Sequence, residues 1–482
     1  MHAKLALMGG PKAVTLAAPP YPVIDHEEIT GVVRTLMTGQ LSQVGHGGVV
    51  GEFEDACAEY FGVKWCHSFN SGTAAIASAL FALGVRPGDE VLTASNTWIS
   101  GINAICHAGA LPVFCDVAPG EQYIDPEEIR RKAGPHTRAV IVTHLWGMPA
   151  DMDPIMQAAR DKHLHVVEDC SHAHGGKYKG RLLGTIGDIG AFSLQGSKAI
   201  VAGEGGFLLT NEELGYQRAM VPGDHGVRLR QELTDAQLAC FSRGGGAWTY
   251  RMAPVCAAIA LAQLRKLDRL NAARQANFDR LHARLQREAP FIEFPVLHEG
   301  SIRGWYSTPA TFALEHPGVG RDLFVEACQA EGANVRGVGY DNFYEIPLYQ
   351  DPAVFSQLWP AEHPGAAKLR TPPPGSLKNN EALRTRQLLL PIFATECSQL
   401  MDQIADAIAK VAGQLDALAA HGSPARDPQL VETRRCRPMA GRPAWRRWTS
   451  HPRRDWKCAA TGLMKNGLGP TCSTRSRPGP CG

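Results

Sequence analysis

The residues of this chain best suited to covalent chemistry are an acid and a lysine in the stretch 166–211. Asp169 follows an apolar run that has the character of a buried strand, and Lys198 comes 29 residues later, between a small-residue turn and the Gly-rich turn 203–206. A lysine amine can form a Schiff base with an aldehyde, and a carboxylate can keep a pyridine nitrogen protonated so that the ring withdraws electrons. The pair therefore predicts a pyridoxal phosphate (PLP) site. An acid that ends a strand is also often only a helix N-cap.

A second group of residues is typical of a phosphate site. Gly72, Thr73 and Ala74 stand between a short apolar run and a helix made of small residues. Glycine lets a ligand approach the backbone closely, and the free N–H groups at a helix start attract anions. Ser193, five residues before Lys198, is a further candidate donor to a phosphate. Glycine turns before helices are common, so this signal is weak without the lysine.

Aromatic residues follow two of the predicted strands. Trp98 could lie flat on a heterocycle or could instead cap the core, and the sequence leaves both interpretations open. His144, Trp146 and Gly147 end another strand, where we expect them to shape a pocket.

The elements that must position these residues alternate between short apolar strands and helices from Trp65 onward. This alternation indicates an α/β fold with a mainly parallel sheet covered on both faces. Ligands bind at the carboxyl ends of such strands. The predicted strands are residues 66–69, 90–93, 111–115, 140–143, 164–167 and 206–210.

Four regions follow along the chain. Residues 1–25, in which Pro19, Pro20 and Pro22 disfavour a helix, are expected to form an N-terminal arm; 26–252 a large PLP-binding domain; 253–422 a linking helix and a small C-terminal domain; and 423–482 a basic, disordered tail. The other predicted elements are helices at 27–37, 53–61, 253–287, 320–331 and 398–419, and a strand at 306–314.

The composition argues against a membrane-spanning protein and against a protein held together by disulfides or zinc. No apolar run approaches the length of a membrane span, so a cytoplasmic protein is expected. Thirteen scattered cysteines without a CxxC pair or a zinc-like His/Cys cluster indicate reduced thiols and no metal site. The tail holds 13 Lys or Arg residues against 3 acids, within a chain of net charge +2. Such a tail could bind nucleic acid, but a segment that cannot form a core is the better-supported interpretation.

In their order along the chain, these motifs resemble the DegT/DnrJ/StrS family of PLP-dependent aminotransferases from about residue 7 to 418. The matching stretches are Leu-Met-Gly-Gly-Pro from 7, Ser-Gly-Thr-Ala-Ala from 71, Asn-Thr-Trp from 96, His-Leu-Trp-Gly from 144, Pro-Ala-Asp-Met-Asp from 149, Glu-Asp-Cys-Ser-His-Ala-His-Gly from 168, and Phe-Ser-Leu-Gln-Gly-Ser-Lys from 192. The resemblance implies fold type I: a large domain with a mostly parallel seven-stranded sheet, a smaller α+β C-terminal domain, and a homodimer with shared active sites.

The resemblance also implies roles for individual residues. Lys198 would be the Schiff-base lysine and Asp169 the partner of the pyridine nitrogen. The remaining cofactor contacts would be the phosphate group Gly72, Thr73, Ala74 and Ser193, Trp98 stacked on the ring, and His172 near the phenolic oxygen. Thr249 stands where many relatives have an asparagine that reaches the neighbouring subunit's phosphate, so that contact is in question. The substrate is expected to meet Gln195, Tyr306, Arg336 and Tyr340.

The expected reaction moves an amino group from glutamine or glutamate to a ketone on a six-membered ring, a keto-cyclitol or keto-sugar. A nucleotide-linked keto-sugar and a 3-amino-5-hydroxybenzoate-synthase-like reaction remain alternatives. Related sugar dehydratases carry histidine where this chain has Lys198, which argues against dehydration. An alternative from another class is a regulatory or scaffold protein whose tail binds nucleic acid.

Overall fold

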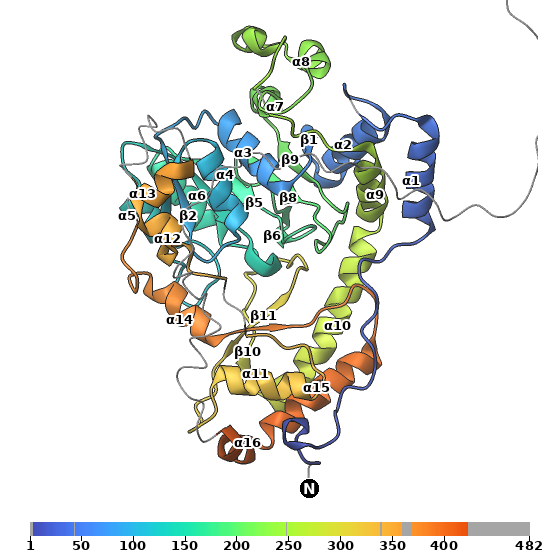
Figure 1. The fold of residues 1–482 in the computed structure, drawn as a ribbon, viewed down its shortest axis with the longest axis vertical. Coiled ribbons are helices and arrows are strands. Elements are labelled where there is room, and N and C mark those ends of the chain that lie inside the picture. Colours follow the sequence, from blue (N-terminus) through green and yellow to red (C-terminus); the bar gives the residue numbers. More distant parts are fainter. Residues whose placement is uncertain are drawn as a thin grey trace, which may run out of the picture. The chain divides into compact units, whose positions relative to one another are not determined.

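The computed structural model in Figure 1 describes residues 3–42, 44–246, 248–337, 340–358, 369 and 371–422. The tail 423–482, and with it the prediction that the tail is disordered, lies outside the described residues. Residues up to Ser423 form one compact unit.

The predicted seven-stranded sheet is confirmed. Its strands lie in the order β1-β9-β8-β5-β4-β2-β3, and among them only β9 runs against the others. Their bounds are β1 (Trp65–Phe69), β2 (Glu90–Ala94), β3 (Leu111–Cys115), β4 (Thr137–Thr143), β5 (His165–Asp169), β8 (Ile189–Ser193) and β9 (Gly206–Thr210).

Both faces of the sheet are buried because apolar residues occupy alternate and intervening positions alike. In β4, Ala139 and Ile141 belong to one apolar cluster and Val140 and Val142 to another. Successive strand residues point to opposite faces, so each face needs its own helical cover (Figure 1). The helices of this part are α1 (His26–Thr38), α2 (Gly48–Phe61), α3 (Gly72–Ala82), α4 (Ile99–His107), α5 (Pro126–Lys132), α6 (Met152–Asp161), α7 (Glu213–Met220), α8 (Gly226–Glu232) and α9 (Pro254–Arg265).

A separate apolar core lies in the C-terminal part, where α10 (Leu267–Glu288) packs against α15 (Ser398–Ala412). Leu5 of the N-terminal arm is buried in the same core, and Glu331 accepts hydrogen bonds from arm N–H groups. The other elements there are the antiparallel strands β10 (Ile292–Glu293), β11 (Thr308–Phe312) and β12 (Gln387–Leu390), and the helices α11 (Arg321–Ala330), α12 (Pro347–Gln350), α13 (Pro352–Phe355), α14 (Lys378–Arg386) and α16 (Leu415–Gly422). A small hairpin, β6 (Lys177–Tyr178) and β7 (Arg181–Leu182), follows β5.

Two predicted helices are wrong in extent. The helix expected at 253–287 is two helices that meet at Lys266, whose backbone is not helical and whose ammonium pairs with Glu28. The apolar spacing runs through this break, so the pattern could not reveal it. The helix expected at 398–419 divides at Gly413 into α15 and α16.

The nine cysteines in the described part of the chain are free thiols, six of them buried, as predicted. None of the helices described there is both long enough and apolar enough to cross a membrane.

Candidate active site

A cavity of about 350 Å³ lies at the carboxyl edge of the sheet and gathers most of the predicted site residues. Serines 71, 100, 171 and 197 and Glu204 complete its lining. The predicted residues that line it are Gly72, Thr73, Trp98, Asp169, Ser193, Gln195, Lys198 and Tyr306.

Lys198 is buried, with 7% of its surface exposed, in the turn between β8 and β9. Burial lowers the pKa of its amine to about 8, and the attraction of Asp169 opposes this shift only in part. The amine nitrogen lies 4.3 Å from the centre of the Tyr306 ring. A substantial fraction of this lysine is therefore uncharged near neutral pH, as a nucleophilic amine must be.

The backbone around Lys198 is fixed from two sides. Its N–H donates to the carbonyl of Gln195 at 2.8 Å, which closes the turn. Its carbonyl accepts a hydrogen bond from the hydroxyl of Tyr21, which comes from the N-terminal arm. Arg274 of α10 donates to the same hydroxyl at 3.4 Å. Nothing in the sequence pattern pointed to Tyr21 or Arg274, because the sites they serve are far away along the chain.

Asp169 ends β5 and faces the cavity, and its Oδ1 accepts the N–H of Ser171 at 3.1 Å. The preceding residue, Glu168, points to the other face and is fully buried. It accepts the Nε2–H of His144 at 3.0 Å and three backbone N–H groups from residues 184–187. Burial would raise the pKa of Glu168, but these hydrogen bonds outweigh burial and lower it. Glu168 thus anchors the strand end that presents Asp169.

Glu168, His144 and Cys170 are also close enough together to hold a metal ion. The Nδ1 of His144 accepts the N–H of Ala150, so the ring's proton lies on Nε2 and is donated to Glu168. Both carboxylate oxygens are occupied as acceptors, and we assign this cluster a structural role.

The turn from β1 into α3 brings together residues of the predicted phosphate site. A Cβ atom added to Gly72 would lie 2.7 Å from the Cβ of Ser193, so only glycine allows these segments to approach so closely. Ser71 caps α3 by accepting the N–H of Ala74 at 3.1 Å, and Ala74 is therefore not a free donor. The N–H groups of Gly72 and Thr73 have no acceptor among the described residues and remain available, as does the hydroxyl proton of Ser193.

One side of the site is a stack of aromatic rings. His172 lies parallel to Tyr306 with ring centres 3.8 Å apart, and Trp146 stacks on Tyr340 at 4.8 Å. Trp98, 45% exposed, contacts Tyr340 at 5.2 Å. Burial, together with the charge of Lys198, holds the pKa of His172 well below its ordinary value, and its Nδ1 accepts the N–H of Trp146. His172 therefore packs against Tyr306, and Tyr340 packs against Trp98 at the mouth of the cavity. Neither His172 nor Tyr340 lines the cavity itself.

Two predicted residues lie apart from this cavity. Thr249 is exposed, and its backbone carbonyl accepts a hydrogen bond from the side chain of Asn70 at 3.1 Å. Arg336 is exposed and its backbone pairs with Leu389.

The residues of the cavity fit PLP. The cavity offers a buried amine whose pKa is lowered to about 8 for an aldehyde, a carboxylate for a pyridine nitrogen, and free N–H and hydroxyl donors for a phosphate beside a glycine that leaves room for it.

Comparison with known proteins agrees with this chemistry. The sequence pattern of the DegT/DnrJ/EryC1/StrS aminotransferase family matches residues 22–409. A putative L-glutamine:3-amino-2,3-dideoxy-scyllo-inosose aminotransferase of Streptoalloteichus tenebrarius is 32% identical and aligns over 87% of this chain and all of its own length. A GDP-perosamine synthase of Escherichia coli O157:H7 is 37% identical over 46% of this chain and 59% of its own. The crystal structure of a 3-amino-5-hydroxybenzoic acid synthase superposes with a TM-score of 0.68 at 25% identity, over 83% of this chain and 99% of that one.

Proposed function

From the premise that this chain belongs to the DegT/DnrJ/EryC1/StrS aminotransferase family and is a PLP-dependent aminotransferase, we propose that it transfers the amino group of glutamine or glutamate to a keto-cyclitol. The regulatory or scaffold alternative is thereby set aside for the part of the chain that the family covers.

We choose a neutral acceptor because the cavity lining holds few positive charges. Among the described residues, Lys198 is the one Lys or Arg in the lining, beside five serines and a glutamine. A neutral polyol needs hydrogen-bond donors and acceptors, whereas a diphosphate-linked sugar needs cations. Arg228 lies outside this lining and is buried against Glu54, and Lys179 pairs with Asp153. The relative named as a glutamine-dependent inosose aminotransferase supports the same acceptor class.

Each residue has a defined task in this proposal. Bound PLP supplies an electron-withdrawing ring that stabilises negative charge on the substrate carbon. Asp169 holds the proton on the pyridine nitrogen, and the amine of Lys198 moves a proton between substrate and cofactor carbons. Such positioned proton transfer contributes roughly 10²–10⁴-fold to the rate.

The binding residues hold the cofactor and exclude water. The N–H groups of Gly72 and Thr73 and the hydroxyl of Ser193 bind the phosphate, and Trp98 covers the ring from the mouth. Gln195, fixed by hydrogen bonds from Ser197 to its Oε1, keeps its amide N–H groups for the acceptor's hydroxyls.

A nucleotide-linked keto-sugar is the alternative acceptor, supported by the similarity to GDP-perosamine synthase and by the exposed Arg336 near Tyr340. An acceptor like that of 3-amino-5-hydroxybenzoate synthase is a further alternative, because that enzyme shares the fold.

We also propose a homodimer. Helix α1 turns apolar side chains to the surface, with exposed fractions of 59% for Ile29, 48% for Val33 and 83% for Met37. A row of such residues on one helix is typical of a protein interface.

The test of the acceptor is a pair of saturation curves with glutamine as donor, one with a keto-cyclitol and one with a nucleotide-linked 4-keto-hexose. We expect turnover of the cyclitol and little of the nucleotide sugar. Turnover of the nucleotide sugar alone would contradict the choice of acceptor and leave the aminotransferase activity intact. Lys198→Ala, which removes the amine, should be inactive with both.

A further inference from the structure

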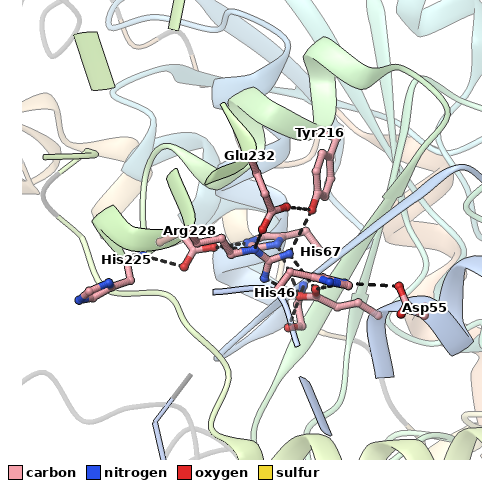
Figure 2. Close-up of polar contacts among 10 residues, drawn as sticks. His46, Asp55, His67, Tyr216, His225, Arg228 and Glu232 are labelled. Atoms are coloured by element: carbon pink, nitrogen blue, oxygen red, sulfur yellow. Dashed lines mark hydrogen bonds and ion pairs between the residues drawn. The ribbon is translucent and has the colours of Figure 1, made fainter. Parts of the chain in front are cut away.

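A buried network of charges lies outside the lining of the cavity, and Figure 2 shows its polar contacts. It joins α2, β1, α7 and α8, four elements that are separate in sequence. Its buried members are Glu54, His67, Ser68, Tyr216, Asp224 and Arg228, with Glu232 at the edge.

Arg228 and Glu54 form its centre. The guanidinium donates two hydrogen bonds to the carboxylate, at 2.8 and 3.1 Å, and a third to Glu232 at 2.7 Å. The hydroxyl of Tyr216 accepts from Arg228 at 3.0 Å and donates to Glu232 at 2.5 Å. All three guanidinium nitrogens of Arg228 and both carboxylate oxygens of Glu54 thus take part in hydrogen bonds.

The network is bonded to residues near the end of β1. Glu54 Oε1 accepts both the backbone N–H and the hydroxyl of Ser68, at 2.9 and 2.7 Å, and His67 faces Asp224 at 3.3 Å. Ser68 is three residues before the cap Ser71 of α3. Any rotation of the strand end would therefore move the N–H groups at the start of α3.

The same network holds a second segment against the turn. Asp224 follows residues 221–223, which pair through their carbonyls with the N–H groups of 246, 248 and 250. The carbonyls of Thr249 and Tyr250 in turn accept from the side chain and backbone of Asn70, at 3.1 and 2.6 Å. Asn70, next to Ser71, is thus held by a different segment from the one that holds Ser68.

Stability alone is a poor reason for such a cluster. Burying an ion pair costs desolvation free energy that its attraction often fails to exceed, and apolar replacements of equal size are often as stable. The hydrogen bonds that Glu54 and Arg228 share with each other and with Ser68, Tyr216 and Glu232 instead fix one arrangement of the groups around them.

We propose that the Glu54–Arg228 network positions the Gly72–Thr73 turn for the phosphate of PLP, with Tyr216 and Asn70 as positioning residues. The inference rests on the proposed function. In this proposal Thr249 helps to hold Asn70 of its own subunit through its backbone carbonyl. This role does not depend on the length of the Thr249 side chain.

The test compares two ligands that Lys198 can capture, PLP and pyridoxal, which lacks the phosphate. Affinities are measured by absorbance on the full chain after removal of cofactor. Tyr216→Phe removes one hydroxyl and keeps the ring's stack on Trp65, and Asn70→Ala removes one exposed amide. Each variant should weaken PLP binding by about three- to tenfold, the effect of losing one or two hydrogen bonds, and leave pyridoxal binding unchanged.

Tyr344→Phe is the matched control, because its hydroxyl also donates to a glutamate, Glu381, but in a part of the chain that does not touch β1. It should change neither affinity. Equal weakening of both ligands, or no change in the ratio of the two affinities in either variant, overturns the inference. A wild-type protein that binds neither ligand overturns the proposed function as well, so the two failures are distinguishable.

Discussion

At the scale of single residues, the reactivity of the Lys198 amine depends on how far burial removes it from water. Lys198 loses hydration without gaining a close carboxylate contact, and its pKa falls to about 8. Asp169 is near enough to oppose that fall and is held by a backbone N–H. The Tyr306 ring, stacked on His172, covers the amine and limits its contact with water.

The pH dependence of aldehyde capture by Lys198 follows from these positions. Because the neutral amine reacts, the rate of PLP capture by the apoprotein should rise with pH around a midpoint near 8, where an ordinary lysine would give about 10.4. Asp169→Asn removes the charge that favours the ammonium and should move the midpoint lower. Stopped-flow absorbance measures it.

The control is Asp153→Asn, an exposed carboxylate paired with Lys179, which should not move the midpoint. Asp169→Asn should also lose most transaminase activity, because an amide cannot hold the pyridinium proton. A fully active Asp169→Asn enzyme would mean that the acid is misassigned.

At the scale of elements, the site is built where strands end and helices begin. The carboxyl ends of β1, β5 and β8 meet at one edge of the sheet, and their following turns supply the phosphate donors, the acid and the lysine. The β1–α3 turn and the end of β8 approach so closely that a side chain at Gly72 would not fit.

Gly72→Ala tests that close approach. The new methyl group would meet Ser193 at 2.7 Å, so β8 or α3 must shift, at a cost of about 1–3 kcal/mol in the free energy of unfolding. PLP affinity should fall with it, because the N–H donors move. Gly101→Ala in α4 is the control, since its added Cβ has no heavy atom within 4 Å. Denaturant unfolding of both variants should show the difference; equal stability would refute the close approach.

At the scale of the whole molecule, the N-terminal arm connects the C-terminal core with the site. The arm is tied into the C-terminal core by Leu5 and its hydrogen bonds to Glu331, and Tyr21 reaches the backbone of Lys198. Helix α1, which follows the arm directly, keeps apolar residues at the surface.

Met37→Glu places a charge on this face of α1 and should reduce the molecular mass in solution from dimer to monomer, because an unpaired charge is costly to bury at an interface. Light scattering after size exclusion measures the mass. Val296→Glu, at an apolar residue 87% exposed in another part of the chain, is the matched control and should leave the mass unchanged. A Met37→Glu dimer as tight as wild type would place the interface elsewhere.

Removal of residues 423–482 should leave activity, dimer mass and melting temperature nearly unchanged. The segment is rich in arginine and proline and lacks an apolar period, and α16 ends at Gly422. A fall of more than about 4 °C in melting temperature, measured by calorimetry, would show that the tail packs on the body.

Local pattern was sufficient for six of the seven strands of the large sheet, all but β8, and for most of the site. Strands β4 and β5 contain runs of consecutive apolar residues, 139–142 and 166–167, because both faces are covered, and the strand ends and turns after them contain the glycines, the acid and the lysine in order. A parallel sheet brings strand ends to one edge, so Gly72, Asp169, Ser193 and Lys198 could be placed together from the sequence, and the cavity confirms their proximity.

What only the tertiary structure decided are contacts between segments far apart in the chain. The hydroxyl of Tyr21 on Lys198, the pair of Glu54 with Arg228, and the stack of His172 on Tyr306 each join residues with no common local pattern. The breaks at Lys266 and Gly413 likewise lie within continuous apolar spacing. Periodicity reports which face of an element is buried, whereas the identity of the residue it meets there depends on how the elements pack.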